Sequence, residues 1–458
     1  MNIADIFWQA RNDSINDLVP LTKIKTAADK ELFNKQDYAV GFTLDEFILE
    51  FPAVDSTKIF FNNKLNKTYY YDRDNHILFP ITLVGKKFLS PNNTPMGDMI
   101  KKTSESFAIY HQSGNYYPQM IALNDRMRME YFNMLIEDNV QGDLYKNFIE
   151  AYALSDYGCD AIPCENIRKL MRSRSLEEAA KAKRIVAAAL KHYPDEVIIF
   201  RGESSKSTPY DRSWSWTTDI NVANFFATRF GNEGSRIITG KAAKDNIEHY
   251  FDDEKECFVD PSNIEVVETL ELYGYSWLET ETTPYIINLY HQHKAMIIDE
   301  YKSAAANNLH TPLHSMRVLY LSLILGSIFK LNHKELSTLA ISAAYHDLGR
   351  VDDSIDDSHG HRSAKIFLKR NKKHTIDAET AAFLIAYHCL DDSIAFRQIS
   401  KRFSGNKKTS LLYNIIKDAD ALDRVRFGKD GLDISYLRLD ESKKMTLIAL
   451  RLLDQITM

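Results

Sequence analysis

The segment Ala343–Ala364 most constrains how this chain can fold. An apolar helical pattern runs directly into His346-Asp347, a loop rich in aspartate follows, and His359 precedes the next helix. An imidazole beside a carboxylate, with a second histidine beyond the loop, provides ligands for one or two metal ions. Taken alone, the pair also fits an N-cap-like aspartate next to a half-buried histidine, so the rest of the C-terminal third has to decide.

Further polar groups face inward from other predicted helices of this region. His314 lies on the apolar stripe of one helix, and His388 ends another. Asp420 shares a helix face with Leu412 and Ile416. A lone buried carboxylate is strongly unfavourable, so Asp420 must be paired, protonated or metal-bound. Inward polar groups on several helices therefore indicate a site rather than isolated buried side chains.

The order of these residues resembles the HD superfamily of metal-dependent phosphohydrolases. The resemblance covers roughly residues 290–440 and rests on His346–Arg350, His359–Ala364 and Lys417–Arg424. It implies an all-α HD-type domain that holds one divalent ion, with Asp347 bridging to a second. The implied metal ligands are His314, His346, Asp347 and Asp420 for the first ion, and His359 and His388 for the second. Arg317 and Arg350 are candidate phosphate ligands, with a surface or structural role as the equal alternative.

The segment His310–His314 is also similar to the phosphodiesterase domain of the SidE family of secreted bacterial effectors. Those proteins pair an ADP-ribosyltransferase, which modifies an arginine of ubiquitin, with an HD-like phosphodiesterase that joins phosphoribosyl-ubiquitin to a serine. This resemblance implies His310 and His388 as the catalytic nucleophile and acid. Two departures are visible: the transferase-like region comes first here, and the HD ligand set is intact, which favours metal-dependent hydrolysis.

Three short elements follow one another in the middle of the chain. A strand predicted over Val197–Phe200 ends in Arg201-Gly202, and a second strand contains Ser215-Trp216-Thr217 before an apolar helix. Glu254-Lys255-Glu256 then leads into an apolar strand, which predicts that both glutamates point to one strand face. Each piece alone is common on protein surfaces, so their order carries the information.

That order resembles the mono-ADP-ribosyltransferase family over roughly residues 125–275, with Ser-Trp-Thr in place of the family's Ser-Thr-Ser. The resemblance implies an α+β domain that uses NAD as substrate, with Glu256 stabilising the oxocarbenium-like state and Ser215 orienting it. Arg201 would hold the NAD phosphate and ribose, and Glu254 would accept the proton of an arginine acceptor. The remaining residues of the implied NAD site are Gly202, Trp216 and Thr217.

The pattern of residues 1–120 predicts a small α+β extension, which is a candidate for substrate recognition. Short β-rich runs at Lys58–Phe61, Thr68–Tyr71 and Ile77–Val84 alternate with turns, and Pro91–Pro95 reads as a loop. The polar segment Glu279–Pro284 is expected to be a linker. The predicted domains are therefore the extension at 1–120, the transferase-like domain at 121–284 and the HD-type domain at 285–458.

Length and composition bound the remaining possibilities. A chain of 458 residues has room for about three domains. A net charge of −6 gives no reason to expect nucleic-acid binding. The four cysteines make no C-x-x-C pair, which fits a cytosol-like compartment, and the first residues do not form a Sec signal. The longest apolar run, Leu319–Leu331, is too short to span a membrane, and secretion by a non-Sec route stays open.

The sequence thus predicts a bifunctional enzyme. It would attach ADP-ribose from NAD to a protein, with ubiquitin as one candidate acceptor, and cleave a phosphodiester or pyrophosphate, with the product of the first step as a candidate substrate. Two alternatives remain: the HD-type domain hydrolyses a separate nucleotide or reverses the modification, or it is a non-catalytic ligand-sensing module that controls a toxin-like transferase.

Overall fold

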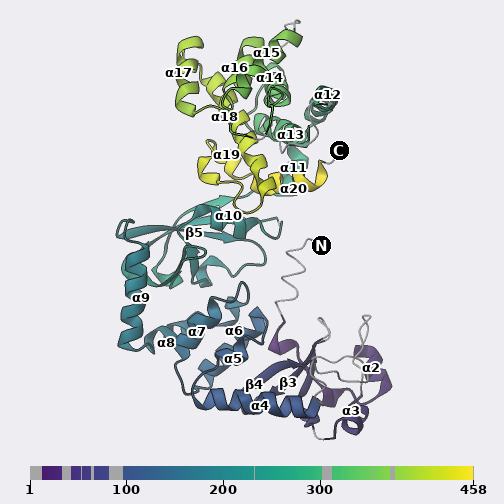
Figure 1. Ribbon diagram of the computed structural model, residues 1–458, viewed down its shortest axis with the longest axis vertical. Helices are drawn as coiled ribbons and strands as arrows, with labels where there is room; N and C mark the ends of the chain where they lie inside the picture. The colour runs from purple at the N-terminus through teal and green to yellow at the C-terminus, as the bar shows by residue number, and fades with distance from the viewer. Residues whose placement is uncertain are drawn as a thin grey trace. The chain divides into compact units, whose positions relative to one another are not determined.

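The computed structural model describes residues 13–33, 43–52, 54–62, 67–81, 96–231, 233–301, 312–352, 354–371 and 377–456 (Figure 1). The chain folds as two compact units. Unit 1 consists of Met1–Val197, Thr208–Ser215 and Ala242–Ile264. Unit 2 consists of Ile198–Ser207, Trp216–Lys241 and Glu265–Met458. The predicted transferase-like region therefore contributes segments to both units.

Unit 1 begins with an antiparallel four-stranded sheet in the order β1-β2-β3-β4. Its strands are β1 (Val19–Pro20), β2 (Ile59–Asn62), β3 (Lys67–Asp72) and β4 (Ile77–Ile81). The helices α2 (Ala27–Phe33), α3 (Leu44–Glu50) and α4 (Met96–Gln112) accompany this sheet, and Ile59, Phe61, Phe79 and Phe107 share its core. The three predicted strands are confirmed, whereas Val84 and the loop Pro91–Pro95 lie outside the described residues.

The rest of unit 1 is mainly helical. Its elements are α5 (Tyr117–Met120), α6 (Asp125–Glu137), α7 (Leu144–Tyr152), α8 (Cys164–Arg172), α9 (Leu176–Ala189) and the hairpin β8 (Ile247–Phe251) with β9 (Glu256–Val259). One apolar core joins Phe132 and Phe148 of the helices to Trp214 and Phe258. This packing fixes α7 beside β9, which matters for the site described below.

Unit 2 contains a part with both strands and a helix, and it holds most residues of four neighbouring strands in the order β10-β7-β5-β6. The strands are β5 (Glu196–Glu203), β6 (Ser215–Thr217), β7 (Arg236–Ala243) and β10 (Glu265–Glu271), and α10 (Ile220–Thr228) follows β6. Asp219 caps α10, because its side chain accepts from the backbone N–H of Asn221 at 2.9 Å. The expectation that Arg201 follows the strand is wrong, since β5 continues to Glu203.

Gly202 explains why α10 packs so closely on β5. A Cβ at this position would lie 1.8 Å from the carbonyl oxygen of Ala223 and 2.5 Å from the amide nitrogen of Ala227. Both alanines are fully buried. The absence of a side chain therefore lets the helix backbone approach the strand directly.

The C-terminal part of unit 2 is helical, as the sequence predicts. Its helices are α11 (Tyr275–Glu281), α12 (Pro284–Tyr301), α13 (Pro312–Ile328), α14 (His333–Tyr345), α15 (His359–Arg370), α16 (Ala378–Tyr387), α17 (Asp392–Arg402), α18 (Lys407–Leu422), α19 (Asp440–Lys443) and α20 (Thr446–Gln455). α13 is apolar on almost every face and packs against α12, α14 and α18. It forms the centre of this helical part.

The segment Glu279–Pro284 differs from the expected linker. Residues 279–281 end α11, whose Leu278 is buried, and α12 begins at Pro284. Ala223 and Ala227 of α10 belong to the same apolar core as the C-terminal helices. The Asn221 side chain also joins α10 to the helical part, since it donates to Asp433 Oδ1 at 2.9 Å. Apolar burial thus joins the sheet of unit 2 to its helices.

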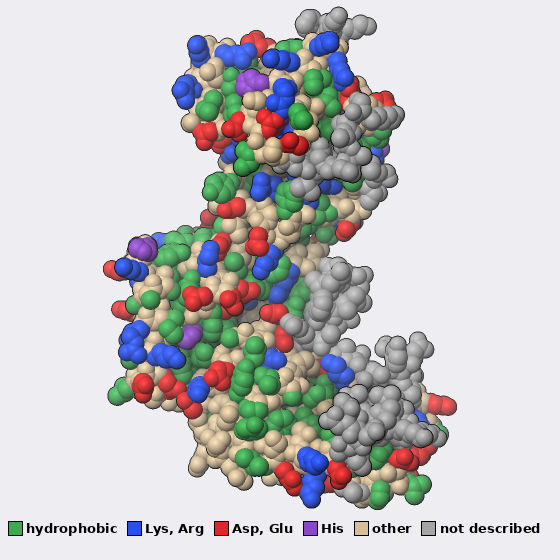
Figure 2. Space-filling model, in the orientation of Figure 1, with side chains coloured by type: hydrophobic (Ala, Val, Ile, Leu, Met, Phe, Trp, Pro, Cys, Tyr) green, Lys and Arg blue, Asp and Glu red, His purple; other side chains and the backbone are tan. Residues whose placement is uncertain are grey.

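Charged side chains of both signs are intermixed on the face shown in Figure 2. This view shows small groups of either sign rather than one extended basic field. Within the described ranges, no helix is both long enough and apolar enough to cross a membrane.

Candidate functional site

Unit 2 brings together the four imidazoles and two carboxylates that the sequence predicts as metal ligands. They come from α13, the C-terminal end of α14, the start of α15, the end of α16 and from α18. The residues are His314, His346, Asp347, His359, His388 and Asp420. All are buried except Asp420, which is half-buried. His310, the remaining candidate of this region, lies outside the described residues.

Asp347 lies between two pairs of histidines. Its Oδ2 is 3.5 Å from Nε2 of His314 and 3.6 Å from Nε2 of His346. Its Oδ1 is 3.0 Å from Nε2 of His359 and 3.4 Å from Nε2 of His388. Each carboxylate oxygen therefore faces one pair, which is the arrangement that a bridging ligand requires.

The outer nitrogen of each of these histidines is anchored. In every case Nδ1 lies within hydrogen-bond distance of an oxygen, and a carbonyl or ionised carboxylate oxygen only accepts. The partners are Asp423 Oδ2 for His314 (2.8 Å), the Ala343 carbonyl for His346 (2.7 Å), the Asp356 carbonyl for His359 (2.5 Å) and the Ile385 carbonyl for His388 (2.8 Å). Nδ1 therefore carries a proton in each ring, and Nε2 of each ring points at Asp347 and at the opposite ring of its pair.

The two Nε2 atoms of each histidine pair lie close together. Nε2 of His314 is 3.2 Å from Nε2 of His346, and Nε2 of His359 is 3.0 Å from Nε2 of His388. Burial opposes protonation of His314, but hydrogen bonds to three aspartates, the strongest from Asp347, raise its pKa to about 10. Burial lowers the pKa of His346 to about 4. Burial also opposes protonation of His359, but its hydrogen bond to Asp347 raises its pKa to about 10, so one ring of each pair can carry a positive charge.

Asp423 is a further residue of this cluster, one that the sequence analysis did not assign. Besides accepting from His314, it forms ion pairs with Arg317 and, at 2.9 Å, with Nη1 of Arg426. Burial raises the pKa of Asp423, but the bonds from His314 and Arg317 outweigh burial and keep the pKa below its ordinary value. It lies three residues after Asp420, within the segment that carries the HD resemblance, and this spacing is the signal that could have found it.

The two candidate phosphate ligands have different surroundings. Arg317 is 6% exposed and is held by Asp423, so the structural alternative describes it. Arg350 is half-buried, with Nε 3.5 Å from Asp347 Oδ1 and Nη1 donating to the Ser354 carbonyl at 3.2 Å. Arg350 therefore stays a candidate for contact with an anionic substrate.

Two glycines bring the helix ends of the site together. A Cβ on Gly349 would lie 2.5 Å from the Ser363 amide nitrogen, and the Gly349 N–H donates to the Ser363 hydroxyl at 2.8 Å. A Cβ on Gly360 would lie 2.7 Å from the Ala386 carbonyl oxygen. Because both positions are glycine, the start of α15 can approach the turn after α14 and the end of α16 this closely. His359 and His388 can meet for this reason.

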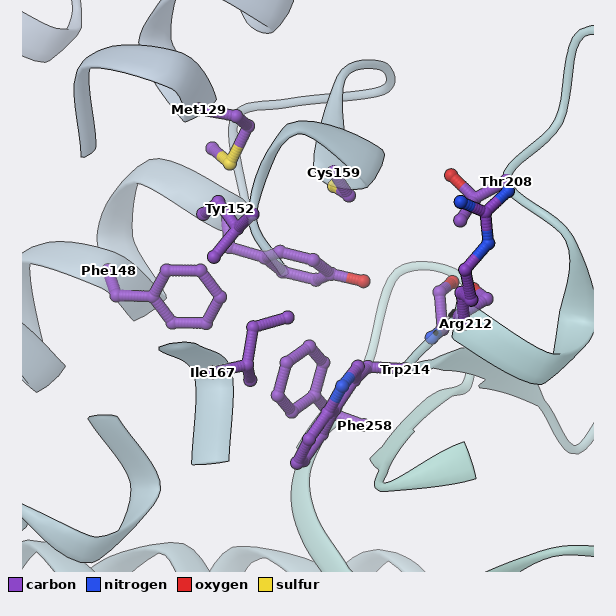
Figure 3. A pocket seen from close by; sticks show the side chains of 12 residues that line it. Met129, Phe148, Tyr152, Cys159, Ile167, Thr208, Arg212, Trp214 and Phe258 are labelled. Atoms are coloured by element: carbon purple, nitrogen blue, oxygen red, sulfur yellow. Dashed lines mark hydrogen bonds between the residues drawn. The ribbon is translucent and has the colours of Figure 1, made fainter. Parts of the chain in front are cut away.

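Unit 1 contains a second candidate site, a small pocket with a cavity volume of about 20 Å³ (Figure 3). Its lining is mainly aromatic and apolar, with an arginine and several hydroxyl groups on one side. The lining residues are Met129, Phe148, Tyr152, Cys159, Ile162, Ile167, Thr208, Arg212, Ser213, Trp214, Ser215 and Phe258. Ser215, predicted to orient the catalytic glutamate, is one of them.

Glu256 is joined to this pocket by Tyr152. The Tyr152 hydroxyl donates to Glu256 Oε1 at 2.6 Å. The tyrosine ring is 7% exposed and packs on Phe148 and Phe258, with ring centroids 5.6 and 5.0 Å away. Burial and the Glu256 charge raise the pKa of Tyr152 well above its ordinary value, so its hydroxyl stays a donor. The sequence analysis missed Tyr152, although it follows Phe148 by four residues on the apolar face of α7.

The prediction that Glu254 and Glu256 point to the same face of one strand is wrong. Strand β9 begins at Glu256, and Glu254 belongs to the exposed turn that precedes it. Lys255 has a φ of 49°, which reverses the chain between the two glutamates. The two side chains therefore do not share a strand face, because the two-residue alternation begins only after the turn.

The other predicted NAD-site residues belong to unit 2. Arg201 and Gly202 lie in β5, and Gly202 serves the close approach of α10. Trp216 is 2% exposed and is a core side chain. The Thr217 hydroxyl accepts from the Asp219 N–H at 3.0 Å and so shapes the turn into α10.

Comparison with known families identifies the helical part of unit 2. Its buried histidine–aspartate cluster belongs to a phosphodiesterase-type module: residues 290–456 match the model of the SidE phosphodiesterase (PDE) domain. The C-terminal part of the chain is therefore a SidE-family-like phosphodiesterase module, and the SidE resemblance predicted from His310–His314 is confirmed at this level. The match does not extend to residues 1–289. Neither the curated proteins nor the solved structures contain a significant match.

Proposed function

We propose that the C-terminal module is a metal-dependent phosphodiesterase that cleaves the pyrophosphate of an ADP-ribosylated protein. The observation that carries this proposal is the convergence of four Nε2 atoms on the two oxygens of Asp347, at 3.0–3.6 Å. Such a buried set needs a compensating positive charge, and an imidazole–carboxylate set is suited to divalent transition metals. The match to a phosphodiesterase family supports phosphate esters as the substrate class.

The protein's own residues would bind, orient and charge-balance the site. His314, His346, Asp347 and Asp420 would hold one cation, and His359 and His388 would hold a second across Asp347. When bound, the two cations supply Lewis-acid stabilisation of the charged phosphoryl group. Asp423 keeps the proton of His314 on Nδ1, so that Nε2 remains a ligand. Arg350, beside Asp347, is available for a second phosphate of the substrate.

For the unit 1 pocket we propose NAD-dependent ADP-ribosyl transfer to a protein. The support is a glutamate held by a buried tyrosine at an aromatic pocket, together with the resemblance of the Arg201, Ser215 and Glu256 segments to ADP-ribosyltransferases. Glu256 would stabilise the cationic ribose as the bond to nicotinamide breaks. An arginine of the acceptor protein would attack the ribose.

The two activities would act in sequence. Hydrolysis adds water across the pyrophosphate of the attached ADP-ribose, releases AMP and leaves phosphoribose on the acceptor. A serine hydroxyl of a second protein in place of water would leave a phosphoribosyl bridge. The resemblance to the SidE family makes ubiquitin our proposed acceptor.

The test is the mass of the acceptor after incubation with NAD and the full chain. Wild-type protein should leave phosphoribose or a phosphoribosyl bridge and release AMP, Asp347→Ala should leave intact ADP-ribose, and Glu256→Gln should leave the acceptor unmodified. Mixing the two variants should restore product, because each supplies the step that the other lacks. Identical acceptor masses from wild type and Asp347→Ala would reject sequential action.

The resemblance of His310–His314 to the SidE family implies a second mechanism, in which His310 and His388 would perform the phosphoryl transfer without a metal. The two mechanisms differ in one measurement. Full activity after removal of bound metals by a chelator would support the histidine mechanism, whereas loss of activity that added metal restores would support the metal site.

A further inference from the structure

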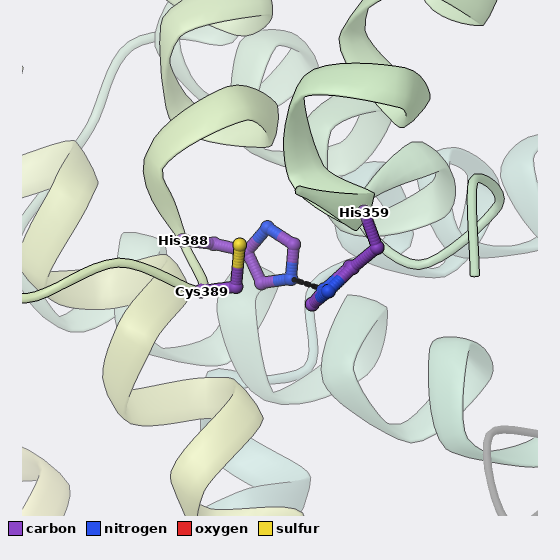
Figure 4. A group of neighbouring side chains, drawn as sticks. All are labelled: His359, His388 and Cys389. Carbon is purple, nitrogen blue, oxygen red and sulfur yellow. Dashed lines mark hydrogen bonds between the residues drawn. The ribbon is translucent and has the colours of Figure 1, made fainter. Parts of the chain in front are cut away.

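Cys389 extends the second histidine pair into a three-residue cluster. It follows His388 at the end of α16, and the start of α15 supplies His359 (Figure 4). One donor atom each from His359, His388 and Cys389 lie within 4.8 Å of one another. None of the activities proposed above uses the thiol.

The absence of a side chain at Gly360 leaves room for the Cys389 thiol between the start of α15 and the end of α16. A Cβ on Gly360 would lie 3.0 Å from Cys389 Sγ and 2.8 Å from the Ile385 carbonyl oxygen. Only glycine therefore lets α15 begin so close to the end of α16. The thiol is half-buried; its hydrogen bond to the Asp357 carbonyl is long and weak at 3.6 Å, and, although burial opposes this, the His359 ring lies close enough to lower the pKa of the thiol. The sulfur therefore lies beside the two imidazoles with which it would share a cation.

The donor geometry of this cluster suits a small tetrahedral cation. Nε2 of His359 and Nε2 of His388 are 3.0 Å apart, and Asp347 Oδ1 is 3.0 and 3.4 Å from them. Nitrogen ligands at about 2.0–2.1 Å from a tetrahedral zinc ion lie roughly 3.3 Å apart. Backbone carbonyls hold the outer nitrogens of both rings, so little reorganisation is needed before binding.

The two halves of the site differ in chemical character. His314, His346, Asp347 and Asp420 offer nitrogen and oxygen only, which is compatible with manganese as well as softer ions. The half at His359 and His388 has a sulfur donor beside it. Thiolate ligands favour zinc over manganese or magnesium, since soft donors prefer soft or borderline cations.

We propose that His359, His388 and Cys389, with Asp347 as the shared fourth ligand, form a thiolate-containing zinc site. The Cys389 thiol releases its proton to solvent as the sulfur binds the cation. This inference rests on the proposed function, because the site is the second cation position of the proposed phosphodiesterase. It adds the identity of the metal and a ligand that the HD resemblance does not supply.

The experiment uses Co²⁺ as a spectroscopic substitute for zinc in the chelator-treated full chain. We expect a thiolate-to-cobalt charge-transfer band in the near ultraviolet that Cys389→Ser abolishes, while visible ligand-field bands from the first cation position persist. The same substitution should weaken zinc binding at least about tenfold and change manganese binding less than about twofold. Cys164→Ser is the matched control, because this half-exposed cysteine belongs to unit 1, and it should leave the band unchanged.

The outcomes separate this inference from the proposed function. Cobalt that binds with ligand-field bands but without a charge-transfer band would overturn the cysteine ligand and leave the metal-dependent phosphodiesterase intact. A charge-transfer band that survives in Cys389→Ser would also overturn it. A protein that binds no cobalt at all would reject both. Circular dichroism of Cys389→Ser checks that loss of the band does not result from misfolding.

Discussion

The hydroxyl of Tyr152 donates a hydrogen bond of 2.6 Å to Oε1 of Glu256, across 104 residues of sequence. Because the tyrosine ring is buried against Phe148 and Phe258, the hydroxyl has a fixed position. It can therefore hold this oxygen of the glutamate in place. In the proposed transferase reaction, Tyr152 would act as a positioning residue.

Replacing Tyr152 by phenylalanine should remove this hydrogen bond and leave the ring packing in place. We expect NAD cleavage to fall about 10- to 100-fold, mainly in kcat, since a hydrogen bond to a charged group contributes about 1.5–3 kcal/mol. Nicotinamide release measures the effect. Tyr145→Phe is the control, because Tyr145 is also buried on α7 and should change the rate little. Equal losses in both variants would mean that Tyr152 acts only through packing.

Glu256→Gln should abolish NAD cleavage while the fold is retained. The amide keeps the shape of the side chain but removes the charge that stabilises the oxocarbenium-like state, so the rate should fall at least about 100-fold. Glu254→Gln is the comparison, since Glu254 lies in the exposed turn before β9, and it should spare NAD hydrolysis. Near-wild-type transfer by Glu256→Gln would eliminate this residue as the catalytic glutamate.

Asp347→Ala should remove bound metal and phosphodiesterase activity together. Both oxygens of this carboxylate face histidine pairs, so its loss affects both proposed cation positions. NAD cleavage should be nearly unchanged, because Glu256 and its pocket belong to unit 1. Elemental analysis of the purified protein and phosphodiester turnover are the measurements. Full metal content in the variant would contradict the proposed role of Asp347.

Asp423→Asn should weaken metal binding without removing a direct ligand. The amide is a poorer acceptor for the Nδ1–H of His314, and loss of such a partner typically costs 10- to 100-fold in metal affinity. Asp418→Asn is the control, since Asp418 is a buried carboxylate of the same segment that accepts from the Arg438 and Leu439 backbone. Metal titration should show a loss in Asp423→Asn alone, and unfolding curves correct for any difference in stability.

Gly202→Ala should destabilise unit 2. The added Cβ would overlap the backbone of α10 at Ala223, which cannot move without disturbing the core, and overpacking typically costs about 1–3 kcal/mol. Ile198→Val on the same strand is the control, because Ile198 is 39% exposed and its change should stay within about 0.5 kcal/mol. Denaturant unfolding compares the two. Equal stability of both variants would show that the backbone of α10 does not lie in close contact with Gly202.

Much of the fold could be predicted because its signals are local. The helical period after residue 285 and the alternating runs at residues 58–81 identify elements from neighbouring side chains alone, and both predictions are confirmed. The positions of Arg201 and Glu254 could not be predicted in the same way. Whether a strand continues through Arg201, or begins only after Lys255, depends on strand partners and on a turn with positive φ.

The amino-acid sequence by itself determined the order and spacing of the histidines and aspartates from His314 to Asp420, and the helices that carry them. Only the tertiary structure decided that Asp347 lies between two histidine pairs, that Cys389 joins one of them, and that Asp423 holds His314. The physical reason is that helix periodicity fixes which face a side chain occupies, whereas close approaches between distant segments depend on packing of the whole unit. Gly360 shows this dependence, because its missing side chain has meaning only where α15 meets the end of α16.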